Sequence, residues 1–287
     1  MQKIWVCGAS GQIGTAINDM VGQFEFETIN TDMDDLNITN MKEVYNFGEK
    51  TRPDIIINCA GITSVEQCEE EPREAFKVNA LGARNLSIIA KKSGAKFIQI
   101  STDDVFDGRS EKPYNEFSST NPKTIYGKSK LAGEHYVKEF INEHFIIRST
   151  WVYGKGDNFV VDFLEKIHTR KVVSIATDHY GSPTNANELA KFILHLACTN
   201  EYGTYHATNQ GICSRYDFAK EILRLTGEKG RIKAVPTEKS DFSVVRPANA
   251  VLENFILSLT DIYDFPNWEQ SLAQYLKERG MIAHEGK

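Results

Sequence analysis

The chain has 287 residues, 41% of them hydrophobic and 25% charged, which is enough to bury a core in one large domain or in two closely associated ones. Its 33 basic residues are scattered and outnumbered by 39 acidic ones, so the net charge is −6 and the basic patch of a protein that binds nucleic acid or an anionic membrane is missing. The five cysteines form no Cys-x-x-Cys motif and no apolar run approaches the roughly 18 residues of a membrane span, so we expect a cytoplasmic protein.

The first predicted element is a buried strand at residues 3–7, which runs directly into a glycine-rich turn and a helix. The turn has the spacing Gly8-x-x-Gly11-x-x-Gly14. Glycine lets the backbone approach a pyrophosphate closely, and the helix N-terminus offers free N–H groups and a positive dipole end. The order strand, glycine turn, helix therefore predicts a dinucleotide site that includes Gly8, Ser10, Gly11 and Gly14.

The second predicted strand, residues 27–30, is followed by an acidic segment. Asp32 is placed to accept hydrogen bonds from an adenosine ribose, whereas a 2′-phosphate would need a basic residue there. No basic residue occurs between Lys3 and Lys42, so charge alone favours NADH over NADPH. The alternative is that Asp32, together with Asp34 and Asp35, forms a solvated turn.

A helix at 41–50, with Asn40 as its N-cap, leads to a third strand at 55–58. Small residues at the end of this strand, Ala60 and Gly61, would let a cofactor ribose lie close to the backbone. A long helix at 72–92, closed by Gly94, carries Asn79. Asn79 is either part of the cofactor site or a hydrogen-bonding residue of the helix interior.

The fourth strand, residues 97–100, ends in the polar tip Ser101-Thr102-Asp103-Asp104, where open α/β sheets carry their sites. Apolar residues at helical spacing in 128–140 indicate a helix, with Tyr126 and Lys130 on one face. A phenol beside an ammonium is suited to passing a proton. Tyr216 and Lys220 repeat the spacing, and the hydroxyl-bearing strand tip favours the first copy.

After a fifth strand at 145–148 the pattern changes. We expect helices at 157–169, 188–198, 214–226 and 268–279, and strands at 172–176 and 203–207. The whole predicts an α/β protein: a Rossmann-like doubly wound parallel sheet with a smaller C-terminal α/β substrate lobe. Residues 1–150 form the dinucleotide-binding domain, to which 185–208 return, and residues 151–184 and 209–287 form the lobe.

Other catalytic chemistries lack support in the sequence. The seven histidines show no H-E-x-x-H motif, so we expect no metal site, and no G-x-S-x-G motif marks a nucleophilic serine.

The motifs together resemble the extended short-chain dehydrogenase/reductases, and within them the dTDP-4-dehydrorhamnose reductase family. The stretches that carry the resemblance span nearly the whole chain: GASGQIG at 8–14, LNITN at 36–40, RPDIIIN at 52–58, QISTDDVFDG at 99–108, YGKSKLAGE at 126–134, WVYG at 151–154, GSPT at 181–184 and RPAN at 246–249.

The resemblance implies reduction, with NADPH or NADH, of the 4-keto group of a nucleotide-linked 4-keto-6-deoxy sugar, by a monomer or homodimer. Tyr126 would protonate the ketone oxygen, Thr102 would hydrogen-bond it, and Lys130 would hold the nicotinamide ribose and ease the proton transfer. The matching cofactor positions are Gln12, Ile13, Asn37, Ile38, Gly61, Ile62 and Thr63. The positions on the substrate side are Thr102, Asp103, Asp104, Trp151, Asn158 and Arg246.

Two departures from the family pattern bear on the substrate. Asp104 stands where the family usually has tyrosine, which would put an acid beside the sugar unless this residue turns to solvent or to a loop amide. Asn37 replaces an aspartate and can still accept a hydrogen bond. Two alternatives stay open: an enzyme for another 4-keto-6-deoxy sugar nucleotide, such as a UDP-linked N-acetylated one, and a non-catalytic regulatory subunit like the methionine adenosyltransferase β subunit.

Overall fold

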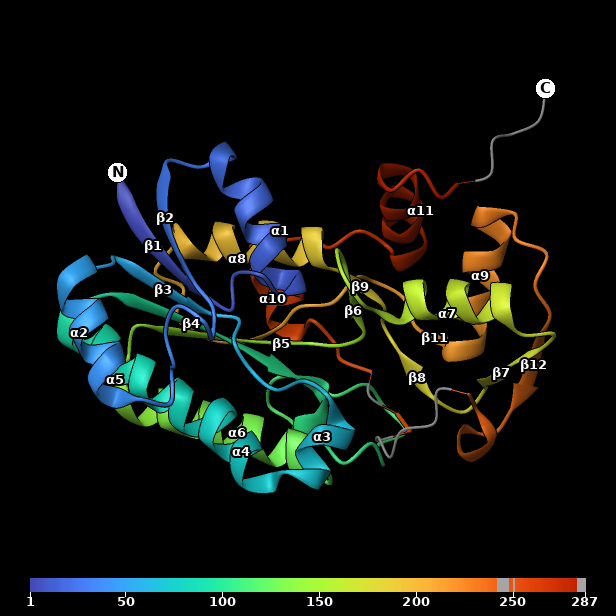
Figure 1. Ribbon diagram of the computed structural model, residues 1–287, viewed down its shortest axis with the longest axis horizontal. Helices are drawn as coiled ribbons and strands as arrows, with labels where there is room; N and C mark the ends of the chain where they lie inside the picture. The colour runs from blue at the N-terminus through green and yellow to red at the C-terminus, as the bar shows by residue number, and fades with distance from the viewer. Residues whose placement is uncertain (242–247, 250, 283–287) are drawn as a thin grey trace.

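The computed structural model of the protein describes residues 1–241, 248–249 and 251–282 (Figure 1). Its centre is a six-stranded parallel sheet with the strand order β10-β5-β4-β3-β1-β2. The strands are β1 (Gln2–Cys7), β2 (Phe26–Thr31), β3 (Ile55–Asn58), β4 (Lys96–Thr102), β5 (His144–Ser149) and β10 (Gly203–His206). The predicted Rossmann-like doubly wound sheet is confirmed, and each predicted strand is found within two residues of its expected bounds.

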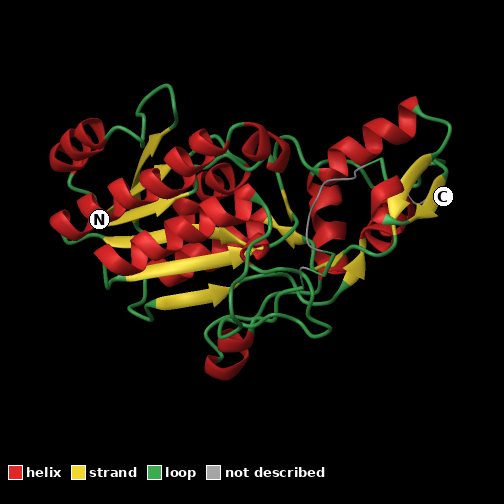
Figure 2. Ribbon diagram, turned by 90° about the horizontal axis from the view of Figure 1, so that it is seen from below, coloured by secondary structure: helices red, strands yellow, loops and turns green. Residues whose placement is uncertain are grey.

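Helices cover both faces of this sheet (Figures 1 and 2). One face packs against α1 (Gln12–Met20), α8 (Ala186–Ala197) and α10 (Phe255–Thr260), and the other packs against α2 (Met41–Thr51), α5 (Ala83–Ser93) and α6 (Ile125–Phe140). Alternate strand residues serve the two cores: Val6 and Ile57 point to the first, Trp5 and Ile56 to the second. Because both faces are buried, the strands read as apolar runs in the sequence.

The helix predicted at 72–92 is interrupted. It consists of α4 (Pro72–Phe76), a π-helical stretch η2 (Lys77–Gly82) and α5, and it is preceded by the short α3 (Val65–Glu70), which the sequence pattern did not indicate. Asn79 lies in the π-helical stretch. Gly82, at the end of this stretch, lies so close to Ile38 that a Cβ would come within 2.6 Å of its Cδ1 atom. π-helical stretches such as η2 occur often at functional sites.

The C-terminal part has a core of its own beyond the carboxyl edge of the main sheet (Figure 1). It contains α7 (Phe159–Thr169), α9 (Arg215–Thr226) and α11 (Trp268–Glu278), and three two-stranded sheets. These sheets pair β7 (Val173–Ala176) with β12 (Ile232–Val235), β8 (Tyr180–Gly181) with β11 (Cys213–Ser214), and β6 (Val152–Tyr153) with β9 (Thr184–Asn185). Short 3₁₀ turns are η1 (Val21–Gln23), η3 (Asp103–Val105) and η4 (Thr237–Lys239).

The division of the chain between the two cores differs from the expectation in one segment. The expected return of 185–208 corresponds to α8 and β10, which pack in the core of the main sheet. Residues 255–265, assigned above to the lobe, also pack there, through Leu257 and Phe265. Only from Trp268 onward does the end of the chain join the second core.

Local signals in the sequence account for several helix ends. The Asn40 side chain accepts hydrogen bonds from the N–H groups of Lys42 and Glu43, as the predicted N-cap should, and Gly94 ends α5 with φ +71°. Helix α6 begins at Ile125, capped by the Thr124 hydroxyl, which places Tyr126 in its first turn. Among the described residues, no helix has the length and hydrophobicity to cross a membrane.

Candidate active site

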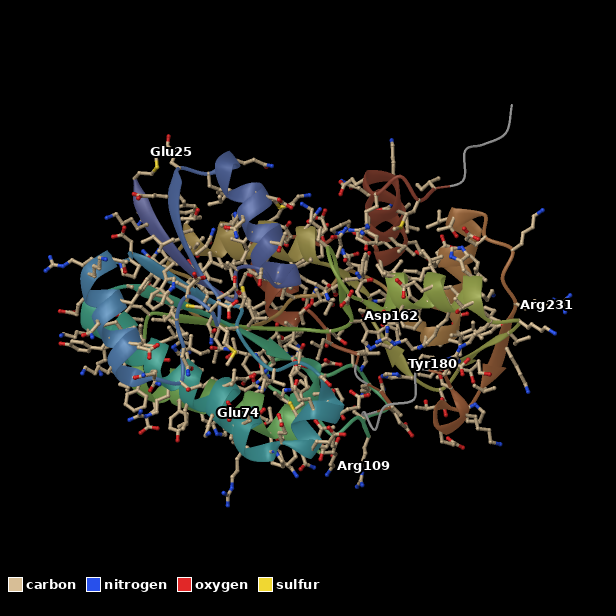
Figure 3. The ribbon with its side chains drawn as sticks, in the orientation of Figure 1. Glu25, Glu74, Arg109, Asp162, Tyr180 and Arg231 are labelled. Atoms are coloured by element: carbon tan, nitrogen blue, oxygen red, sulfur yellow. The ribbon has the colours of Figure 1, made fainter. Side chains whose placement is uncertain are left out.

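A cleft of about 520 Å³ lies between the carboxyl ends of the central strands and the C-terminal part. Its lining comes from the glycine turn, the ends of β3, β4 and β5, helix α6 and, across from them, α7, β7 and α9. Asp162 of α7 is among the lining residues and lies near the middle of the molecule, far from Glu25 and Arg231 at opposite ends (Figure 3). Open α/β sheets bind their ligands at the carboxyl ends of the strands, where this cleft lies.

Each of the three glycines has a different role in the turn. Gly8 has φ +75°, and a Cβ there would lie 2.7 Å from the Ala60 nitrogen. At Gly14 a Cβ would lie 2.3 Å from the Gly8 carbonyl oxygen, so this residue packs the helix on the strand. Gly11 lines the cleft, and a Cβ there would meet only the Gly8 oxygen, at 3.4 Å. The fold therefore requires Gly8 and Gly14, whereas Gly11 leaves space on the cleft side.

The start of α1 fits a bound pyrophosphate. Gly11 is its N-cap and supplies no side-chain cap, so the first N–H groups of the helix are left for a ligand. Gln12 and Ile13 also line the cleft. The Gln12 amide donates to the Asp157 carbonyl at 2.7 Å, which ties this turn to the C-terminal part.

Asp32 supports the glycine turn directly. Its Oδ2 accepts a hydrogen bond from the Ser10 N–H at 3.0 Å, and its own N–H donates to Asp35. Asp34 and Asp35 are exposed, whereas Asp32 is half-buried at the end of β2. The solvated-turn interpretation therefore describes Asp34 and Asp35 but not Asp32, which holds the turn in shape.

The cofactor positions expected after β2 and after β3 fall into two groups. Gly61 and Thr63 line the cleft with Cys59, and Ala60 packs behind Gly8. Asn37 and Ile38 are not among the lining residues, because the Asn37 side chain accepts from the Thr39 N–H and hydroxyl and Ile38 is buried against Gly82.

Asn79 fastens the loop after β3 to helix α6. It is buried, its Oδ1 accepts from the Ile62 N–H at 2.9 Å, and its Nδ2 donates to the Ile62 carbonyl and to the Ser129 hydroxyl. Ser129 in turn donates to the Tyr126 carbonyl at 2.8 Å. Asn79 is thus a buried hydrogen-bonding residue that positions two walls of the cleft without lining it.

Thr102 lies at the tip of β4 and lines the cleft together with Asp103 and Thr150. Its hydroxyl donates to Asp103 Oδ1 at 2.9 Å, and Asp103 Oδ2 accepts from the Thr150 hydroxyl at 2.8 Å. The buried Asp103 carboxylate therefore joins the tips of β4 and β5 and orients two hydroxyl groups of the cleft.

Tyr126 and Lys130 line the same cleft as Thr102. Both are buried, and the Lys130 ammonium donates to the Ile100 carbonyl at 2.6 Å. Burial lowers the pKa of Lys130 to about 8, against an opposing effect of the Glu134 charge. Tyr216 and Lys220 lie instead on α9, where Tyr216 packs against the second core and Lys220 is exposed. The Lys220 ammonium lies 5.9 Å from the Tyr216 ring centre, and neither residue lines the cleft.

Two expected substrate residues lie elsewhere, and one lies outside the described residues. Asp104 is buried below the strand tip, under the start of α6, and does not line the cleft or reach solvent. Asn158 is the N-cap of α7: its Oδ1 accepts from the Val160 N–H, and its Nδ2 donates to the Gly154 and Gly156 carbonyls. Its polar atoms are therefore used in hydrogen bonds within the protein. Arg246 falls outside the described residues.

Trp151, which the resemblance places on the substrate side, lines the cleft in a left-handed backbone conformation. Its φ is +48°, and its ring lies so close to Gly181 that a Cβ there would come within 2.6 Å of Cε2. The Arg215 guanidinium lies 3.5 Å from the Trp151 ring centre and 4.7 Å from that of Phe159. Sequence reasoning missed Arg215 and Phe159, because nothing local distinguishes a cleft-lining residue at a helix start.

No group of three or more His, Cys, Asp or Glu side chains that could hold a metal ion occurs in the part of the chain that the structure describes.

The chain is similar to known proteins along nearly its whole length. Residues 1–281 match the family described as RmlD substrate binding domain. The spore coat polysaccharide biosynthesis protein SpsK of Bacillus subtilis is 37% identical, over 97% of this chain and 98% of its own length.

Two solved structures are similar along their whole length. The dTDP-4-dehydrorhamnose reductase of Clostridium acetobutylicum is 40% identical with a TM-score of 0.95, covering 98% of this chain and 100% of its own. The dTDP-4-dehydrorhamnose reductase of Bacillus anthracis, solved in complex with NADP, is 38% identical with a TM-score of 0.93, covering 97% and 99%.

Proposed function

Because the chain belongs to the RmlD substrate binding domain family, we propose that it reduces the 4-keto group of a nucleotide-linked 4-keto-6-deoxy sugar, converting dTDP-4-dehydrorhamnose to dTDP-L-rhamnose. The names of its relatives support this substrate, since proteins 31% and 32% identical to it in Aggregatibacter actinomycetemcomitans and Escherichia coli are dTDP-4-dehydrorhamnose reductases.

One observation carries the proposal: Thr102, Tyr126 and Lys130 line a single cleft that also contains Gly11. A proton donor, a hydroxyl and a cation thus share one cavity with a helix N-terminus able to bind a pyrophosphate. A regulatory subunit that only binds a cofactor would not need this buried trio, which favours an enzyme.

The cofactor in this proposal is NADPH or NADH, which would supply the hydride. Gly11, Gln12 and Ile13 would hold its pyrophosphate at the start of α1, and Gly61 and Thr63 would lie along it. The negative charge of Asp32 favours the unphosphorylated ribose of NADH, although its carboxylate already accepts a hydrogen bond from Ser10. The NADP complex of the Bacillus anthracis relative supports NADPH as well.

In the proposed reaction Tyr126 donates a proton to the ketone oxygen. The Thr102 hydroxyl, which donates to Asp103 in this structure, turns its one proton to that oxygen when the substrate is bound. Lys130, buried beside them, carries a positive charge that favours the ionised phenol and so eases this proton transfer. Trp151 and Arg215 form the opposite wall, where the sugar nucleotide would lie. Asp103 accepts the Thr102 hydroxyl proton in the absence of substrate and so keeps this side chain at the cleft.

A steady-state assay tests this proposal. The protein is mixed with NADPH or NADH and each member of a panel of 4-keto sugar nucleotides, and cofactor oxidation is followed by absorbance. We expect the highest kcat/KM with dTDP-4-dehydrorhamnose. A preference for a UDP-linked N-acetylated 4-keto sugar would transfer the proposal to that substrate, and no oxidation with any member would refute a reductase.

The product would serve the synthesis of a cell-surface polysaccharide, a role supported by the name of the Bacillus subtilis relative. We place the reaction in the cytoplasm because all five cysteines are free. Whether the chain acts as a monomer or a homodimer stays a prediction for a solution measurement of mass.

A further inference from the structure

A buried ion pair lies directly behind the residues proposed to react. Arg148 of β5 contacts Glu134 of α6 through two parallel hydrogen bonds, Nε to Oε1 at 2.9 Å and NH2 to Oε2 at 2.7 Å. Glu134 is fully buried and Arg148 is 3% exposed. Burial acts to raise the pKa of Glu134, but the hydrogen bond and charge of Arg148 outweigh it and hold the pKa below its ordinary value.

Arg148, the strand member of the pair, lies in a row of residues that face one another across the main sheet. Ser101 of β4, Arg148 of β5 and His206 of β10 are partners in register across three adjacent strands. The Ser101 hydroxyl donates to Glu134 Oε1 at 2.6 Å, and Arg148 NH1 lies 3.5 Å from His206 Nε2. Glu134 therefore connects helix α6 to the residue immediately before Thr102.

The position of Glu134 on α6 links it to the reacting groups. Tyr126, Lys130 and Glu134 are spaced four residues apart, so they form one stripe along the helix. The first two side chains line the cleft, and the third reaches the strands at its floor. A shift of α6 along or about its axis would move Tyr126 and Lys130 away from Thr102, and the contacts of Glu134 oppose such a shift.

Stability gives little reason for such a pair. A buried ion pair replaced as a whole by apolar side chains of similar volume often leaves stability unchanged or improved, whereas directional, bidentate contacts restrict geometry. Catalysis is sensitive to geometry, since a displacement of about 1 Å can reduce the rate about 10²-fold.

We propose that Glu134 and Arg148 are positioning residues of the reductase, which set helix α6 against the Ser101 end of β4 and so bring Tyr126 and Lys130 into register with Thr102. This inference rests on the proposed function. Glu134 also acts electrostatically: its carboxylate favours the protonated form of Lys130. Two thiols act on Lys130 in the same sense, those of Cys59 just after β3 and Cys68 on α3, and Tyr126 lies one helical turn before it on α6.

The first test is Ser101→Ala, which removes one contact to Glu134 and keeps the ion pair. Ser271→Ala is the matched control, because Ser271 is equally buried, accepts a hydrogen bond from the Asn209 amide at 2.9 Å and lies in the second part of the chain. We expect kcat to fall about fivefold in Ser101→Ala, which is the rate change that corresponds to the net free energy of one hydrogen bond. KM for the cofactor should stay unchanged. Equal kcat values for Ser101→Ala, Ser271→Ala and the parent would overturn the inference.

The second test replaces the pair as a whole, with Glu134→Met and Arg148→Met combined so that no buried charge is left alone. We expect a folded protein with a thermal midpoint near that of the parent and kcat at least tenfold lower. Its alkaline pH limit for kcat should also move to lower pH, because Lys130 loses the charge that favours its proton.

A folded double variant with parental kcat and an unmoved pH limit would refute the positioning role. If the double variant does not fold, the comparison of Ser101→Ala with Ser271→Ala still decides. An inactive parent would instead refute the proposed function itself, and the two failures are therefore distinguishable.

Discussion

Replacing Lys130 by methionine should make the protein more stable and less active. Its pKa in the folded protein is about 8 because it is buried, against an ordinary value of 10.5. Below pH 8 Lys130 is protonated in both states, and its buried ammonium costs more free energy in the folded protein than the solvated one does in the unfolded chain. The difference of about 2.5 pH units corresponds to about 3 kcal/mol, at about 1.4 kcal/mol per unit.

The methionine variant loses one hydrogen bond, from the ammonium to the Ile100 carbonyl. That carbonyl keeps a donor, the Gln99 amide at 2.8 Å, so the loss is about 1 kcal/mol or less. We therefore expect Lys130→Met to raise the free energy of unfolding by about 2 kcal/mol at pH 7, while kcat falls because the ammonium is gone. Stability gained at the expense of activity is typical of a residue held in place for function.

The sign of the pH dependence follows from proton binding. Between pH 8 and 10.5 the unfolded chain holds a proton on Lys130 that the folded protein has released, so the parent gains stability from this group as pH rises. The advantage of the variant should shrink by roughly 1.4 kcal/mol per pH unit above pH 8.

Urea unfolding of both proteins without cofactor, at intervals from pH 7 to 9.5, measures this difference, and other groups that titrate in both proteins cancel from it. A variant that is less stable than the parent at pH 7, or a difference that does not change with pH, would refute the reasoning.

Three further changes separate the parts of the cleft. Gly11→Val should abolish cofactor binding in a fluorescence titration without unfolding the protein, because its Cβ meets only the Gly8 oxygen at 3.4 Å; Gly22→Val, where nothing lies within 4 Å, is the control, and unchanged binding by Gly11→Val would exclude this pyrophosphate site. Tyr126→Phe should lower kcat by roughly 10²-fold or more at unchanged cofactor affinity. If Tyr216→Phe did so instead, the proton donor would be misidentified. Gly181→Ala should displace the Trp151 ring, 2.6 Å from the added Cβ, and raise KM for the sugar nucleotide but not for the cofactor; equal effects on both would remove Trp151 from the substrate wall.

The sequence alone was sufficient for features that depend on near neighbours in the chain. The strands of the main sheet are buried on both faces, so their apolar runs identify them without knowledge of their partners. The turn Gly8 to Gly14 and the N-cap at Asn40 act over a few residues, so their spacing predicts them. Thr102 and Tyr126 were found from a polar strand tip followed by a Tyr-x-x-x-Lys spacing, and the resemblance gave both residues their roles.

The tertiary structure decided which polar residues face the cleft, because that depends on contacts distant in sequence. Asp104 follows Asp103 directly, yet only Asp103 lines the cleft, since the chain turns beneath α6 at this point. Arg215 reaches the cleft because its helix packs against α7, β7 and α11 in the second core, which no local pattern reveals. Nothing in the sequence pairs Glu134 of the predicted helix with Arg148 of the fifth strand. Only the packing of α6 on the sheet buries the two side chains together, where each charge compensates the other and neither is left unpaired.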